Sequence, residues 1–111
     1  MNLNGVWKVE LLTMYDWEPR ATGFFRDGNY WGASSQHYAL GSYTVDGTKF
    51  VAEVALIIHG QSRRALFGKK ADRIDITIEA DAAEDEFIGT AKDKNGAHLV
   101  QYKFTRLADW P

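Results

Sequence analysis

The sequence predicts one all-β domain over residues 1–111, folded as an eight-stranded antiparallel up-and-down barrel. Three observations predict this fold. Short segments of alternating apolar and polar residues recur between Gly-containing turns, as in sandwiches and barrels. Aromatic residues make up 14% of the chain, and ten Gly against two Pro indicate strands that bend at glycine. An up-and-down barrel is the simplest arrangement that leaves no open sheet edge.

The longest apolar run, Phe50–Ile58, is the predicted central strand. Its even-numbered residues share one apolar face. The opposite face is nearly as apolar, with Val51, Ala55 and Ile57 beside a single charge at Glu53. A strand that is apolar on both faces needs cover on both sides. No helix is predicted that could cover the outer face, and we therefore expect Val51, Ala55 and Ile57 to form a homodimer interface.

The other seven strands follow from the same alternation. The clearest is RIDITIE, in which three isoleucines face one way and polar residues face the other. The segment Met14–Pro19 interrupts the alternation and is predicted to be a loop. The seven strands are expected at Asn4–Thr13, Thr22–Arg26, Asn29–Ala33, Tyr38–Val45, Arg73–Glu79, Phe87–Lys92 and His98–Arg106.

Glycines mark the turns and the bends. Asp27-Gly28, Asp46-Gly47 and Asn95-Gly96 are dipeptides that favour the positive φ of tight hairpin turns. Gly23 and Gly32 lie inside predicted strands, where glycine marks a bend or a close approach of the backbone. These positions fit a single sheet that curls into a barrel.

Composition excludes several classes of protein. A formal charge of −2 gives no overall field for nucleic acid or an acidic membrane, and neither partner is expected. The absence of cysteine excludes a disulfide framework, a thiolate nucleophile and a Cys-based zinc site. The N-terminal residues lack a signal-peptide pattern and no apolar run is long enough to span a bilayer, so a cytoplasmic location is expected.

No catalytic or metal-binding motif stands out, and we predict a protein that is not an enzyme and that uses no cofactor or metal. His37, His59 and His98 are widely spaced and form no HxH or HExxH pattern. Ser34-Ser35 precedes His37, but nothing like GxSxG surrounds the serines. The favoured interpretation is a turn in which these side chains bond to the backbone. The acidic segment Asp81–Glu86 is interpreted as a solvated hairpin tip.

A long connection follows the central strand. It carries four positive charges around an apolar pair, and this combination of charge and apolar anchor is typical of interfaces. The simpler explanation is that the charges keep a long surface loop soluble. The predicted partner-binding loop consists of Arg63, Arg64, Leu66, Phe67, Lys69 and Lys70.

The interior of the barrel offers a second function. Eight strands enclose a space that side chains just fill, or that holds one small ligand. A small apolar ligand, such as a lipid, is therefore the alternative to a protein partner, although a plain core is the favoured role of these residues. The candidates to line a cavity are Trp7, Phe50, Val54, Ile76 and Tyr102.

The spacing of aromatic residues and glycines resembles that of the GrlR-type negative regulators of type III secretion, most closely over the first sixty residues. The matching features are Asn4-Gly5-Val6-Trp7-Lys8-Val9, Gly23 before Phe24-Phe25, Asp27-Gly28 with Gly32, Tyr38 with Gly41 and Tyr43, and a strand that ends at His59.

The resemblance implies a lipocalin-like barrel that forms a homodimer and restrains a transcription activator by protein contact. In that family an acidic motif follows the Tyr-rich strand and contributes to the contact. The corresponding residues here, Val45-Asp46-Gly47-Thr48, hold one acid, so the role of that motif is not carried over. The function expected from the sequence is a non-enzymatic regulatory binding protein.

Overall fold

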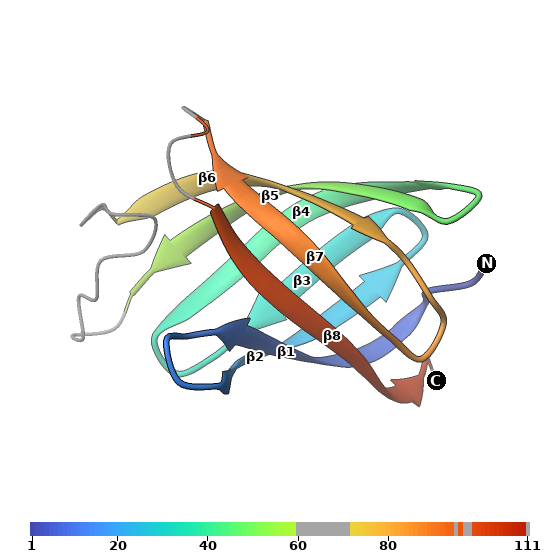
Figure 1. The fold of residues 1–111 in the computed structure, drawn as a ribbon, viewed down its shortest axis with the longest axis horizontal. Helices are drawn as coiled ribbons and strands as arrows, with labels where there is room; N and C mark the ends of the chain where they lie inside the picture. The colour runs from blue at the N-terminus through green and yellow to red at the C-terminus, as the bar shows by residue number, and fades with distance from the viewer. Residues whose placement is uncertain (60–71, 95, 97–98, 111) are drawn as a thin grey trace.

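A computed structural model describes residues 1–59, 72–94, 96 and 99–110, and these residues form a closed β-barrel (Figure 1). Each strand lies beside its neighbours in the chain. The strands are β1 (Gly5–Leu12), β2 (Trp17–Arg26), β3 (Asn29–Ala33), β4 (His37–Asp46), β5 (Lys49–Ile58), β6 (Arg73–Asp81), β7 (Glu86–Asp93) and β8 (Leu99–Asp109).

Antiparallel pairing runs from β1 through β8, and β1 also pairs with β8 to close the sheet. The predicted eight-stranded up-and-down barrel is therefore confirmed. The segments with assigned structure in the described part of the chain are all strands, and none is a helix. A membrane-spanning helix is likewise not found among these residues.

Most strands are longer than predicted, and β2 and β8 extend furthest beyond their predicted ends. The prediction of a loop over Met14–Pro19 is wrong for its second half, because β2 begins at Trp17, which pairs with Leu12. Lys103 of β8 lies 4.7 Å from the centre of the Trp17 ring, which gives this end of β2 a cation–π contact. At the C-terminus, β8 continues to Asp109, which pairs with Gly5 across a bulge.

Both termini lie at one end of the barrel (Figure 1). Aromatic side chains of β1, β2, β5, β7 and β8 pack together inside this end. The Phe25 ring lies 5.6 Å from the Trp7 ring and 5.7 Å from the Phe50 ring, both nearly perpendicular to it. Trp7 and Phe50 have no solvent-exposed surface. Phe87 and Phe104 stack at 5.0 Å and complete the cluster. Edge-to-face packing of this kind favours a solid core at this end of the barrel.

Arg106 connects several segments at this end of the barrel. Its Nη1 donates to the Asn4 carbonyl at 2.8 Å, and its Nη2 donates to the Asn2 carbonyl at 2.7 Å. Its Nε donates to the carbonyl of Glu84 at 2.6 Å. The guanidinium carbon lies 4.7 Å from the centre of the Trp7 ring. One side chain of β8 therefore joins the N-terminal residues and the β6–β7 turn above the aromatic cluster.

Replacement of Arg106 with Ala is expected to lower the free energy of unfolding by about 2 to 4 kcal/mol, since three charge-assisted hydrogen bonds are lost. Arg73→Ala is the matched control, because Arg73 is 65% exposed and its ion pair with Asp75 lies on the surface. The control substitution is expected to lower the free energy of unfolding by less than about 1 kcal/mol. Urea unfolding measures both. Equal losses in the two variants would contradict the role given to Arg106.

Candidate functional site

The outer face of β3, β4 and β5 carries apolar side chains in neighbouring positions. Leu40 of β4 pairs with Trp31 of β3 on one side and with Ala55 of β5 on the other. One step along the strands, Tyr38 of β4 pairs with Ile57 of β5. We call these five residues the apolar wall.

Much of the apolar wall is open to solvent. Trp31 is 41% exposed, Tyr38 is 40% exposed and Leu40 is 48% exposed. The neighbouring strand β6 shows the usual arrangement, because its outward-facing residues Arg73 and Asp75 are charged. Contiguous exposed apolar residues on a folded protein mark an interaction surface more often than isolated ones do.

The C-terminal tail covers the apolar surface beside the wall. Trp110 packs edge-on against Phe24 of β2, with ring centres 6.4 Å apart. Arg26 lies 5.1 Å from the centre of the Trp110 ring on the other side. Phe24 pairs with Trp31, so Trp110 lies beside the apolar wall. Among the described residues, Trp110 therefore packs on Phe24, whereas Trp31, Tyr38 and Leu40 of the wall remain exposed.

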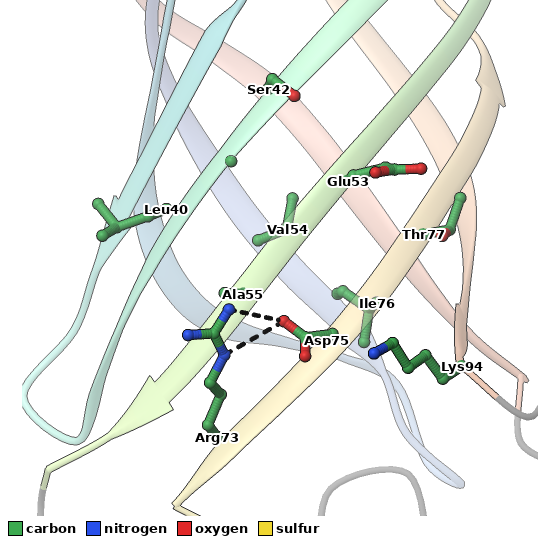
Figure 2. Close-up of a pocket in the computed structure, with 11 residues that line it drawn as sticks. Leu40, Ser42, Glu53, Val54, Ala55, Arg73, Asp75, Ile76, Thr77 and Lys94 are labelled. Atoms are coloured by element: carbon green, nitrogen blue, oxygen red, sulfur yellow. Dashed lines mark hydrogen bonds and ion pairs between the residues drawn. The ribbon is translucent and has the colours of Figure 1, made fainter.

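A surface hollow of about 580 Å³ adjoins the wall over β4, β5 and β6 (Figure 2). Leu40 and Ala55 belong to both the hollow and the wall. The charged residues around the hollow are Glu53, Arg73, Asp75 and Lys94. Arg73 donates to Asp75 Oδ1 from Nη2 at 3.2 Å and from Nε at 3.3 Å. Two acids and two bases thus border an apolar surface.

The structure separates the three residues predicted for the dimer interface. Ala55 and Ile57 lie within the apolar wall. Val51 lies farther along β5 and pairs with Thr44 and Glu79, which are polar. The predicted partner-binding loop, Arg63 to Lys70, lies outside the described residues.

A cavity of about 50 Å³ lies inside the barrel, and its lining includes His37 at the start of β4 and Leu56 near the end of β5. Its described apolar lining comes from inward positions on several strands and includes Val9, Leu56 and Ile78. Four side chains with polar groups also line it: Arg20, Tyr30, His37 and Tyr102.

A β-bulge brings Arg20 to this cavity. Val9 of β1 pairs with Ala21, whereas the next residue, Glu10, pairs with Pro19. Arg20 is therefore the extra residue of β2, and it lines the interior together with its neighbour Ala21. Bulges re-aim side chains in this way, because the extra residue breaks the alternation of the strand.

Two glycines make room for the Tyr30 side chain. A methyl group at Gly32 would lie 2.7 Å from the Tyr30 hydroxyl oxygen, and one at Gly23 would lie 2.9 Å from the Tyr30 ring. The sequence predicted a bend or a close approach of the backbone at Gly23 and Gly32, whereas in the structure the atoms that come close belong to the Tyr30 side chain. Burial raises the pKa of Tyr30, and it raises that of Tyr102 to about 12, so both phenols stay protonated at neutral pH.

Val54, Ile76 and Tyr102 line the cavity as the sequence predicts, but Trp7 and Phe50 do not. They belong to the aromatic cluster at the other end. Arg20 could not be predicted from the sequence, because alternation of residue types does not reveal a bulge. The sequence suggested His37 as a partner of Ser34 or as a metal ligand, but not as a lining residue, although His37 and Ala39 are on the same face of β4.

Ser34 and His37 form a turn. Ser34 Oγ accepts the backbone N–H groups of Gln36 and His37, both at 3.2 Å, and lies 2.9 Å from His37 Nδ1. Ser34 Oγ also lies 3.4 Å from the His37 carbonyl oxygen, so the hydroxyl proton has two acceptors within reach, that carbonyl and Nδ1. This geometry agrees with the predicted backbone-bonded turn.

Burial, and then the positive charges of Arg20 and His59, lower the pKa of His37 below its ordinary value of 6.5. The folded state therefore binds this proton less readily than the unfolded state does. Protonation favours unfolding, so the contribution of His37 makes stability fall as the pH drops through about 6.5.

We expect the NMR titration midpoint of His37 to lie below 6.5. The free energy of unfolding in urea is expected to fall between about pH 7.5 and pH 5.5, and His37→Gln is expected to reduce this slope. A midpoint at or above 6.5, or an unchanged slope in the variant, would contradict the cause assigned to the shift.

Within the described ranges, no three His, Cys, Asp or Glu side chains gather as metal ligands would. The fold and its surfaces define a small closed barrel with an apolar outer wall and an interior cavity that is lined by hydrogen-bond donors. No protein-family model, curated protein or solved structure matches the chain.

Proposed function

We propose that this barrel is a non-enzymatic binding protein that forms a homodimer through the apolar wall. One observation carries the proposal: the outer face of β3 to β5 exposes aromatic and aliphatic side chains in adjacent positions, whereas the outer face of β6 is charged. Burial of such side chains is worth roughly 25 cal/mol per Å² of apolar surface removed from water.

The charges beside the wall favour a second copy as the occupant. In a two-fold interface the same surface meets itself, so it must be complementary to itself. Among the described residues, the hollow next to the wall is lined by two acids, Glu53 and Asp75, and two bases, Arg73 and Lys94. A surface that carries both charges can place a base of one copy against an acid of the other. A partner of strongly acidic or basic character would match it less well.

Replacement of both Ala55 and Ile57 with Lys is expected to produce a monomer, because each copy would bring two ammonium groups into the buried interface, where like charges repel. Light scattering measures the mass, and the native protein is expected to show twice the 12.5 kDa of one chain. The doubly substituted protein is expected to show the mass of one chain.

The matched control is Ile88→Lys with Thr90→Lys, two alternate residues on the outer face of β7. This pair is expected to leave the dimer intact. A dimer that persists in the Ala55/Ile57 variant would refute the interface. Dissociation in the control alone would place the interface on the β7 side of the barrel.

The proposed role of the dimer is regulatory. The resemblance to GrlR-type regulators rests on the residues given above, and it suggests a transcription activator as the protein partner. Such a partner acts in the cytoplasm, which is accordingly the proposed location. The small volume of the interior cavity also favours protein contact over lipid carriage, since pockets for drug-sized ligands have about 300 to 1,000 Å³.

Affinity capture from the native host tests this role. Tagged native protein is expected to retain a transcription regulator. Neutralisation of Arg63, Arg64, Lys69 and Lys70 with Gln is expected to reduce the retention, because the basic loop is the predicted contact. The Ile88/Thr90 variant serves as the control for added surface charge. Capture of no regulator by the native protein would refute the regulatory role and leave the dimer proposal standing.

A further inference from the structure

The polar side chains that line the interior cavity are all hydrogen-bond donors. Arg20 carries a positive charge, Tyr30 and Tyr102 are neutral phenols, and the His37 ring has an N–H group in either tautomer. Among the described residues that line the cavity, none is acidic. Asp93 is buried on β7, but it is not one of these residues and has interactions of its own. The cavity therefore lacks a charged acceptor for its donors.

Arg20 is incompletely paired. Its Nε is buried and has no hydrogen-bond partner in the part of the chain that the structure describes. Its Nη2 lies 4.0 Å from the Glu18 carboxylate, at the limit of an ion pair, and Glu18 is 48% exposed. A buried donor without an acceptor is costly, and native proteins seldom leave one. The bulge thus places a donor, Arg20 Nε, where a bound ligand could supply the missing acceptor.

The size of the cavity limits that ligand. A water molecule needs about 10 to 15 Å³ on a comparable measure, so a cavity of about 50 Å³ has room for only a few heavy atoms. The Arg20 side chain is 24% exposed, which shows that the cavity lies close to the solvent. The other residues that line the cavity are apolar, and they include Val9, Leu56 and Ile78. A compact anion with a small apolar part matches both kinds of lining.

We propose that the interior cavity binds the carboxylate group of a small aliphatic acid. The guanidinium of Arg20 supplies the charge and the Nε–H donor for one carboxylate oxygen. The phenols of Tyr30 and Tyr102, together with His37, provide further donors for the second oxygen. The methyl or methylene group of the ligand lies against the apolar lining. This site is separate from the apolar wall and does not depend on the dimer.

Acetate is the first probe, and acetamide is its neutral control of nearly the same shape. In NMR titrations of the native protein, acetate is expected to shift the ring signals of Tyr30, His37 and Tyr102 in a saturable manner, with a dissociation constant in the millimolar range. Acetamide is expected to bind at least about tenfold more weakly, a difference that corresponds to 1.4 kcal/mol. Equal effects of both probes, or no saturable shift with acetate, would overturn the proposal.

Arg20→Gln removes the charge and is expected to weaken acetate binding at least about tenfold. Arg26→Gln is the matched control, because Arg26 lies on the same strand but faces the solvent. It is expected to change the affinity less than about twofold. An Arg20→Gln protein that folds and binds acetate as the native protein does would overturn the role of Arg20. If this variant does not fold, the comparison of acetate with acetamide still decides the proposal.

Chain length distinguishes a free short acid from the head group of a longer one. Butyrate and octanoate are titrated beside acetate. Affinity that falls from acetate to octanoate assigns the site to a short free acid, since longer chains do not fit. Affinity that rises with length assigns it to a fatty acid whose chain leaves the cavity. Both results require the carboxylate, and binding by none of the three acids would refute the site.

Discussion

The pairing of β1 with β8 closes the sheet, and closure gives the barrel an interior of fixed size that side chains must fill. The filling is uneven. Aromatic rings occupy the end near the termini, where Arg106 holds the N-terminal residues over Trp7. The other end contains smaller aliphatic residues and a cavity. The closed sheet therefore encloses an aromatic cluster at one end and a cavity at the other.

The outer surface is divided in a similar way. Closure leaves every strand with one face toward solvent, and polar side chains normally occupy that face. The strand β6 follows this rule, whereas β3, β4 and β5 present the apolar wall. The chain covers Phe24 with its own Trp110 but leaves the adjacent residues exposed. An interface between copies would cover these exposed side chains, and it fits the presence of both acids and bases among the described residues beside the wall.

Alternation and turn chemistry predicted most of the fold. The three isoleucines of β6 are buried as expected, and Asp27 and Gly28 both have the positive φ of a tight turn. The two apolar faces of β5 pointed to an outer contact surface. The register of neighbouring strands could not be predicted, so the sequence did not show that Ala55 lies beside Leu40 whereas Val51 lies among polar residues.

The bulge at Arg20 could not be predicted from the sequence either. One extra residue in a strand reverses the faces of the side chains that follow, and alternation alone does not reveal where it occurs.

The most direct test of the apolar wall as a self-association surface is an NMR concentration series on the native protein. We predict that dilution will shift the Trp31 indole N–H signal and the amide signals of β3, β4 and β5, and will leave those of β7 unchanged. Shifts confined to another part of the barrel, or a monomer with no shifts at any concentration, would contradict the account.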